Sequence, residues 1–208
     1  MIAVVDYGAG NLHSVKNALD FLGADSAVTS DSEAILSADG VILPGVGAFG
    51  DAMKEMKKRG LDRSVKTAAD NAAKGGKPFL GICMGLQLLF DESEESPGAE
   101  GLGTIPGKVV KIKKYPGLKI PHMGWNNITM PGKSRILKGF EKEPFVYFVH
   151  SYYILPEDES VVSAYTEYGE RLPVAVESGN LFAMQFHPEK SGEIGMGILK
   201  NFLNLRKG

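Results

Sequence analysis

Residues 78–90 read Pro-Phe-Leu-Gly-Ile-Cys-Met-Gly-Leu-Gln-Leu-Leu-Phe, and this stretch decides the fold. Its first half, 78–82, is a short apolar run of the length and composition typical of a buried strand. Cys83 follows at once, with a glycine two residues away on either side. Leu86, Leu89 and Phe90 then continue with helical spacing. A buried strand that runs through a cysteine into a helix predicts one unit of an α/β sheet.

The residues before this stretch repeat the alternation of strand and helix. Short apolar strands are expected at 2–5 and 41–43, and amphipathic helices at 12–22, 48–58 and 61–73. Continuous apolar strands separated by amphipathic helices are typical of a parallel sheet covered on both faces.

The second half has closely spaced strands with Gly/Pro turns. We expect them at 108–112, 125–129, 145–149, 161–165, 174–177 and 181–186, followed by a final helix at 194–203. They predict antiparallel additions to the sheet. The charged run 91–98 is interpreted as a solvated loop. Without an internal repeat or linker, residues 1–208 are expected to form a single α/β domain.

Composition narrows the classes of function. A net charge of −2 gives no global electrostatic reason to bind nucleic acid or an acidic membrane. No apolar run approaches the roughly 20 residues that span a bilayer. The N-terminus has the pattern of a strand rather than a signal peptide, and one cysteine suits a reducing compartment. We therefore expect a cytoplasmic protein.

The segment Gly81–Gly85 has the pattern of a nucleophile elbow, with cysteine where many hydrolases carry serine. Glycines two residues either side leave room for the sharp turn and for a substrate. The helix N-terminus after Cys83 stabilises a thiolate, and the N–H of Met84 is placed for an oxyanion hole. Taken alone, the motif is equally compatible with a core cysteine.

A second motif, Gln185-Phe186-His187-Pro188-Glu189, follows the last apolar strand. In an extended segment residues i and i+2 point to the same side, so His187 and Glu189 can be neighbours. Pro188 disfavours a helical conformation at His187. A histidine base oriented by a carboxylate is what a cysteine nucleophile requires. We therefore predict a Cys83–His187–Glu189 triad.

A third motif, Pro44-Gly45-Val46-Gly47, follows the strand at 41–43. Its glycines let backbone N–H groups approach a substrate, which would complete an oxyanion hole at Val46 and Gly47 together with Met84. An ordinary turn is an equally good reading of this motif alone. Neither a phosphate-binding P-loop motif nor a metal-ligand spacing occurs, so no cofactor or metal is expected.

Taken together, these motifs resemble those of the class I, triad-type glutamine amidotransferases, and in particular the glutaminase subunits of imidazole glycerol phosphate synthase. The resemblance runs the length of the chain, through the segments 6–12, 44–49, 81–89, 121–126, 148–153 and 185–192. It implies a flavodoxin-like fold: a mixed, mostly parallel sheet flanked by helices.

The resemblance also implies an activity. Cys83 would attack the side-chain amide of glutamine, ammonia would leave from the tetrahedral adduct, and water would then hydrolyse the remaining glutamyl thioester to glutamate. Gln87, Ser151 and Tyr152 match family positions that hold the α-amino and carboxylate groups of glutamine.

In this family the ammonia passes to a (β/α)₈-barrel cyclase subunit, in a 1:1 heterodimer, which converts PRFAR to imidazole glycerol phosphate and AICAR in histidine biosynthesis. Trp125 and Lys190 fall in segments that lie near that interface in the family; a core aromatic and a solvated cation are the alternatives. His122 and His150 are interpreted as structural, and His13 as a helix-surface residue.

Two other functions stay open at this point. A paralogous glutaminase would deliver ammonia to another acceptor, such as one in surface-sugar synthesis. A flavodoxin-like binding module without enzymatic activity would bury Cys83.

Overall fold

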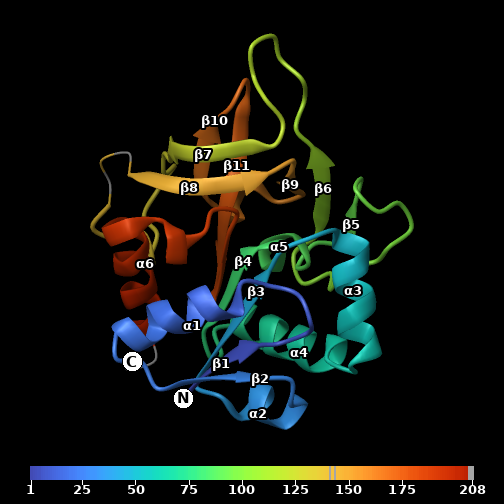
Figure 1. Ribbon diagram of the computed structural model, residues 1–208, viewed down its shortest axis with the longest axis vertical. Coiled ribbons are helices and arrows are strands. Elements are labelled where there is room, and N and C mark those ends of the chain that lie inside the picture. The colour runs from blue at the N-terminus through green and yellow to red at the C-terminus, as the bar shows by residue number, and fades with distance from the viewer. Residues whose placement is uncertain (141, 143, 206–208) are drawn as a thin grey trace.

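A seven-stranded sheet forms the centre of the computed structural model, which describes residues 1–140, 142 and 144–205 (Figure 1). Its strands lie in the order β10-β11-β12-β4-β3-β1-β2. The five strands from β12 to β2 are parallel, and β11 and β10 extend the sheet antiparallel. The bounds are β1 Ile2–Val5, β2 Ser26–Thr29, β3 Gly40–Gly45, β4 Phe79–Cys83, β10 Val162–Glu167, β11 Arg171–Ser178 and β12 Leu181–Met184.

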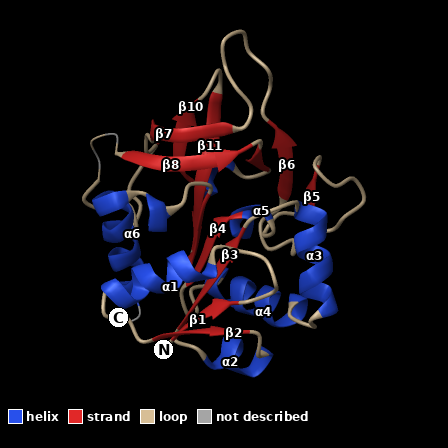
Figure 2. Ribbon diagram, in the orientation of Figure 1, coloured by secondary structure: helices blue, strands red, loops and turns tan. Residues whose placement is uncertain are grey.

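Helices cover both faces of this sheet (Figure 2). One face packs against α1 (Leu12–Phe21) and α6 (Gly192–Asn204). The other packs against α2 (Ser32–Ser37), α3 (Phe49–Lys58) and α4 (Asp62–Ala73). Every residue of β1, β3, β4 and β12 is buried, as a sheet covered on both sides requires. The expected α/β class, with its mostly parallel sheet and antiparallel extension, is therefore confirmed.

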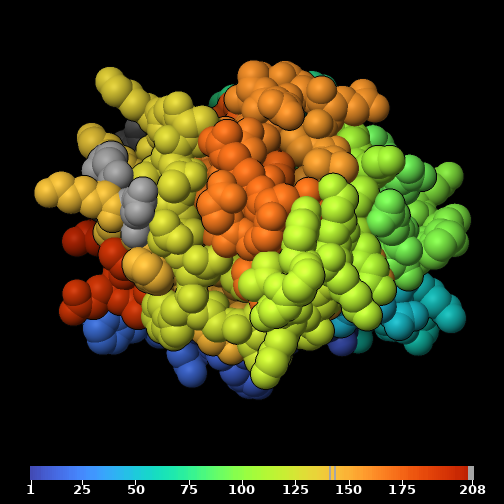
Figure 3. Space-filling view, turned by 90° about the horizontal axis from the view of Figure 1, so that it is seen from above, coloured from blue at the N-terminus to red at the C-terminus, as the bar shows by residue number. Residues whose placement is uncertain are grey.

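Two smaller sheets lie beyond the carboxyl edge of the parallel strands. One consists of β5 (Glu92–Ser93), β6 (Gly107–Lys111) and β9 (Tyr152–Pro156). The other pairs β7 (His122–Asn127) with β8 (Phe145–His150), antiparallel. The loop 112–121 between β6 and β7 forms a ridge beside the hairpin of β10 and β11 (Figure 3). Tyr168 Oη donates to the carbonyl of Lys119 there, at 2.6 Å.

Some elements differ from the sequence-based expectation. The strands β2 and β9 and the helix α2 were not anticipated. Both β2 and α2 are short, and α2 buries only Ile35, so their apolar patterns are weak. The expected strand at 181–186 is parallel to β4 rather than an antiparallel addition, and it ends at Met184.

Two other expectations also need correction. The helix after Cys83 is a single turn, α5 (Met84–Gln87), followed by turns through Phe90. Residues 86–90 are all buried, so their apolar character reflects burial on every side and not helical periodicity. The run 91–98 is not simply a solvated loop. Ser93 is buried in β5, and the side chains of Glu95 and Ser96 accept from the first backbone N–H groups of α3, at 2.8 and 3.0 Å.

Candidate active site

Cys83 lies at the carboxyl end of β4, in a strained turn. Its φ of 54° and ψ of −108° make it the sole non-glycine residue with positive φ in the described part of the chain. A Cβ atom at Gly85 would lie 1.8 Å from the carbonyl oxygen of Leu43, and one at Gly81 would lie 2.7 Å from that of Gly85. The flanking glycines therefore permit the close approach of chain segments that forms the elbow.

His187 is brought to Cys83 by the pairing of neighbouring strands. β12 runs parallel to β4, with Met184 beside Ile82, so the residues that follow both strands meet at one edge. His187 Nδ1 lies 2.9 Å from Glu189 Oε1, and both side chains are at least 98% buried. The backbone N–H of His187 donates to the carbonyl of Tyr147 in β8 at 3.0 Å, which fixes the position of the histidine.

The protonation state of His187 follows from its surroundings. Burial alone would lower its pKa, but hydrogen bonds to Cys83 and Glu189, and the negative charges of both groups, outweigh burial and raise the pKa from 6.5 to about 9. An imidazole with this pKa is protonated at neutral pH. The arrangement therefore supports an imidazolium beside the sulfur, with a carboxylate on its far side.

A pocket of about 290 Å³ opens above Cys83. It gathers segments that lie far apart in the sequence: the loop after β3, the elbow, the end of β8 and the turn after β12. Its lining residues are Val46, Gly47, Cys83, Met84, Gln87, Glu95, Pro121, Val149, His150, Ser151, Tyr152 and His187. The structure thus brings the predicted nucleophile, histidine, oxyanion residues and substrate contacts to one cavity. Glu189 lies behind His187.

Two groups in this region were missed by the sequence reasoning. Glu95, within the charged run, lines the pocket and also accepts from the N–H of Phe49. No local sequence pattern indicates that Glu95 lines the pocket. Gln185 is fully buried with its side-chain amide toward Cys83. The i, i+2 rule that linked His187 to Glu189 applies equally to Gln185 and His187, so that signal was present.

The two residues expected at a partner interface lie on one surface outside the pocket. Trp125 is 55% exposed, so it is not a core aromatic. Its ring stands edge-on to that of Tyr147, with 6.1 Å between centroids. Lys190 is exposed, and its Nζ lies 6.0 Å from the same Tyr147 ring. We call Trp125, Tyr147 and Lys190 the aromatic–lysine cluster. His13 is exposed on α1, as expected, whereas His122 and His150 are buried.

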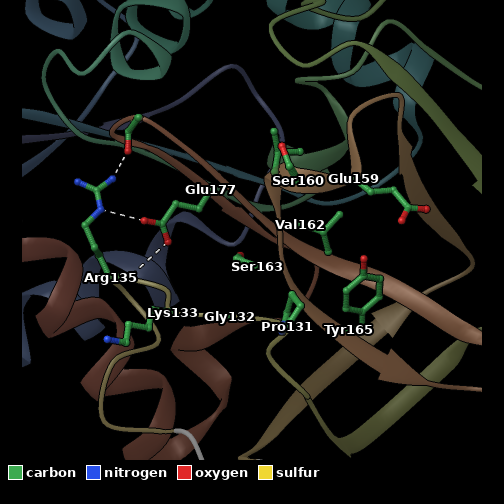
Figure 4. A pocket seen from close by; sticks show the side chains of 12 residues that line it. Pro131, Gly132, Lys133, Arg135, Glu159, Ser160, Val162, Ser163, Tyr165 and Glu177 are labelled. Atoms are coloured by element: carbon green, nitrogen blue, oxygen red, sulfur yellow. Dashed lines mark hydrogen bonds and ion pairs between the residues drawn. The ribbon is translucent and has the colours of Figure 1, made fainter.

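A larger hollow of about 760 Å³ lies elsewhere, along β10 and β11 (Figure 4). Arg135 spans one side of it and donates through Nε to Glu177 and through Nη1 to Asn180, at 2.8 Å each. Arg135 and Glu177 thus pair with each other, and Cys83 is not part of the lining of this hollow. Among the described residues no group of three or more His, Cys, Asp or Glu side chains could hold a metal ion, and no helix is long and apolar enough to cross a membrane.

Comparison with known proteins agrees with this geometry. A family model described as "Glutamine amidotransferase class-I" matches residues 3–205, so the chain belongs to the class I glutamine amidotransferases. Within that family its relatives include imidazole glycerol phosphate synthase subunits HisH. The HisH of Methanothermobacter thermautotrophicus is 52% identical over 99% of this chain and 98% of its own. That of Bacillus cereus is 52% identical over 97% of this chain and 93% of its own.

The solved structure of PurLQS from Thermotoga maritima has the same fold. The TM-score is 0.71 at 22% identity, over 98% of this chain and 97% of the matched one. The curated relatives favour the HisH branch over a paralogue with another acceptor, and an enzyme over a binding module.

Proposed function

We propose that the chain hydrolyses glutamine to glutamate and ammonia, as the glutaminase subunit of an imidazole glycerol phosphate synthase. The buried His187–Glu189 pair beside the strained Cys83, at the floor of the pocket, is the observation that carries this proposal. Chain-long similarity to HisH subunits supports the same assignment.

The chemistry begins with attack of the Cys83 thiolate on the side-chain carbonyl carbon of glutamine. The carbonyl π electrons move to oxygen, and backbone N–H groups near Val46, Gly47 and Met84 stabilise the oxyanion. When the carbonyl re-forms, the C–N bond breaks and the His187 imidazolium gives its proton to the departing nitrogen, which leaves as ammonia. A γ-glutamyl thioester on Cys83 remains.

Hydrolysis of the thioester reverses these roles. His187, now neutral, takes a proton from water as the water oxygen attacks the thioester carbon. The C–S bond breaks, glutamate leaves, and the thiolate–imidazolium pair is restored. Throughout the cycle Glu189 accepts from Nδ1, so that Nε2 faces the reacting groups. Nε2 is buried and has no hydrogen-bond partner among the described residues, so it is available to the reacting groups.

Substrate recognition is assigned to the opposite side of the pocket. Gln87 Oε1 is buried without a partner among the described residues, so it is free to accept from an α-ammonium group. Glu95, which lines the same pocket, adds a negative charge. Ser151 and Tyr152 also line this pocket and are the candidates for holding the α-carboxylate.

The acceptor of the ammonia is proposed to be a (β/α)₈-barrel cyclase subunit in a 1:1 heterodimer, which uses it to convert PRFAR to imidazole glycerol phosphate and AICAR. The aromatic–lysine cluster is the proposed contact surface, because it exposes a large aromatic ring and a cation on the side of β7 and β8.

Replacement of the nucleophile tests the function. Cys83→Ala should reduce glutaminase activity below about one per cent of the wild type, because loss of a nucleophile costs several powers of ten in rate. The variant complex should still form imidazole glycerol phosphate from added ammonium salt, since only the ammonia source is lost. Residual glutaminase activity above that level would refute the assignment of Cys83. Loss of the ammonium-dependent reaction would point to a damaged complex instead.

A further inference from the structure

Gln185 is a buried polar residue that the mechanism above does not use. It is fully buried directly after β12, and its backbone N–H donates to the carbonyl of Val174 in β11 at 2.8 Å. Its side-chain Nε2 lies 3.5 Å from Cys83 Sγ, within the range of a hydrogen bond to sulfur. A buried amide in contact with the predicted nucleophile calls for a functional explanation.

The direction of this amide is fixed by its other partners. The nitrogen and oxygen ends of a glutamine side chain have to be assigned from their surroundings. Gln87 Nε2 lies 3.4 Å from the backbone carbonyl of Tyr152, which can only accept, so the Gln87 NH₂ group faces it. The same NH₂ group lies 2.9 Å from Gln185 Oε1. Because the oxygen of Gln185 is engaged there, its NH₂ group is the end that faces sulfur.

A chain of two buried histidines also ends at the Tyr152 carbonyl. His150 Nδ1 lies 2.9 Å from this oxygen, so Nδ1 carries the proton and Nε2 accepts. His122 Nδ1 lies 2.9 Å from His150 Nε2 and donates to it. Asn126 Nδ2, 3.3 Å from His122 Nε2, completes the sequence of donors. The direction of donation is consistent from β7 to the Tyr152 carbonyl, which accepts from His150 as well as from Gln87.

We propose that Gln185 is a further catalytic residue, whose side-chain NH₂ group donates to the Cys83 thiolate and holds it in position for attack. This role rests on the proposed glutaminase function. A thiolate can only accept hydrogen bonds, and an amide donor in a buried site stabilises it without adding a charge. The titratable groups that face Cys83 are His187, after β12, and Tyr7, after β1. Gln185 is thus a donor to the sulfur that does not depend on a titratable group.

Gln185→Met tests the proposal, because methionine has a similar length and lacks the NH₂ donor. The rate of Cys83 alkylation by iodoacetamide at pH 7 should fall by roughly tenfold to a hundredfold, the range expected for loss of a hydrogen bond to a charged group. Cys83 is the single cysteine of the chain, so alkylation reports on it alone. In the complex with the cyclase, kcat for glutamine should fall to a similar extent, with KM changed less than about threefold.

Gln185→Glu provides a second variant if the first fails to fold. It retains an oxygen for Gln87 and places a carboxylate oxygen opposite the sulfur, so alkylation should slow at least as much as in Gln185→Met. Thr166→Val is the matched control, because it removes a buried hydrogen bond, from Thr166 Oγ1 to the Asn127 carbonyl, outside the site. It should lower the melting temperature without slowing alkylation.

Wild-type alkylation rates in both folded Gln185 variants would overturn the proposal and leave Gln185 a purely structural residue. Alkylation does not require glutamine turnover. A wild-type complex with the ligand-bearing cyclase that fails to hydrolyse glutamine would therefore refute the proposed function, while the alkylation comparison still tests the contact between Gln185 and Cys83.

Discussion

Glu189→Ala isolates the contribution of the carboxylate behind His187. Cys83 and Glu189 together overcome burial and raise the pKa of His187 from 6.5 to about 9, which corresponds to about 3 kcal/mol in favour of the imidazolium. Cys83 and Glu189 both act in this direction. We expect loss of the carboxylate to remove roughly 1–2 kcal/mol, which predicts a decrease in kcat/KM of about fivefold to thirtyfold.

The pH dependence gives a more specific result than the rate. Acylation requires protonated His187, so in the wild type kcat/KM should fall as pH rises through about 9. Without Glu189 the pKa of His187 is lower, and the alkaline decrease should begin at a lower pH. His187→Ala should be nearly as damaging as Cys83→Ala, because it removes the acid and base itself.

The assay is steady-state glutamine hydrolysis by the complex between pH 6 and 10, with circular dichroism to confirm folding. If a folded Glu189→Ala variant keeps the wild-type alkaline limb, the carboxylate does not set the protonation of His187 and the reasoning fails. If it is as inactive as Cys83→Ala, Glu189 has a more direct role than orientation.

Three further predictions concern stability and regulation. Gly85→Ala should lower the free energy of unfolding, measured by urea titration, by about 3 kcal/mol or more, or prevent folding, because its Cβ would lie 1.8 Å from the Leu43 carbonyl oxygen. Gly132→Ala is the control: its Cβ would meet open space, so it should be nearly neutral in the same titration. Burial lowers the pKa of His122 to about 4 and that of His150 to about 3. Between pH 6.5 and these values each histidine is neutral in the folded protein and takes up a proton when the protein unfolds. The contribution of these two histidines to stability should therefore be complete above pH 6.5 and fall toward pH 4 by about 1.4 kcal/mol per pH unit for each, and a flat acid limb would contradict their burial in neutral form. The raised pKa of His187 acts in the opposite direction, and its contribution is lost as pH rises toward 9. Finally, the isolated subunit should have almost no glutaminase activity. Lys190→Ala should weaken the stimulation of this activity by the ligand-bearing cyclase more than it lowers the basal rate. Full glutaminase activity of the isolated chain would refute this gating.

Rotation of the Pro44–Gly47 loop is our candidate for that switch. Gly47 has a φ of 100°, and a peptide flanked by glycines rotates at modest cost. One oxyanion donor is worth roughly a hundredfold to a thousandfold in rate, enough to gate the enzyme without moving Cys83 or His187.

The parts of the site that lie on regular elements could be predicted from sequence. The elbow is indicated by glycines at fixed spacing. The contact between His187 and Glu189 was expected from the period of an extended segment; the contact is present, but Pro188–Lys190 forms a 3-10 turn, so that reason was wrong. The elbow and His187 meet because parallel strands end at the same edge. These rules are local, or depend only on the sheet, so they can be applied without knowledge of the tertiary structure.

The parts that lie on loops could not be predicted. Glu95 reaches the pocket because a two-residue strand, β5, pairs with β6, and nothing in its charged surroundings indicates that pairing. The contact between His122 and His150 depends on the register of β7 and β8, which local pattern does not determine. The single domain, the cytoplasmic location and the assigned roles of the site residues stay predictions.

The hydrogen bond from His187 to the Tyr147 carbonyl has a consequence for communication with a partner. Tyr147 belongs to the aromatic–lysine cluster on the outer surface, and its own N–H donates to Ser191 Oγ at 3.0 Å. A cyclase docked on that cluster would be one tyrosine and one backbone hydrogen bond away from the catalytic imidazole. If the proposed docking holds, coupling between the two proteins would need no extended pathway, because Tyr147 belongs to the aromatic–lysine cluster and also accepts from the backbone of His187.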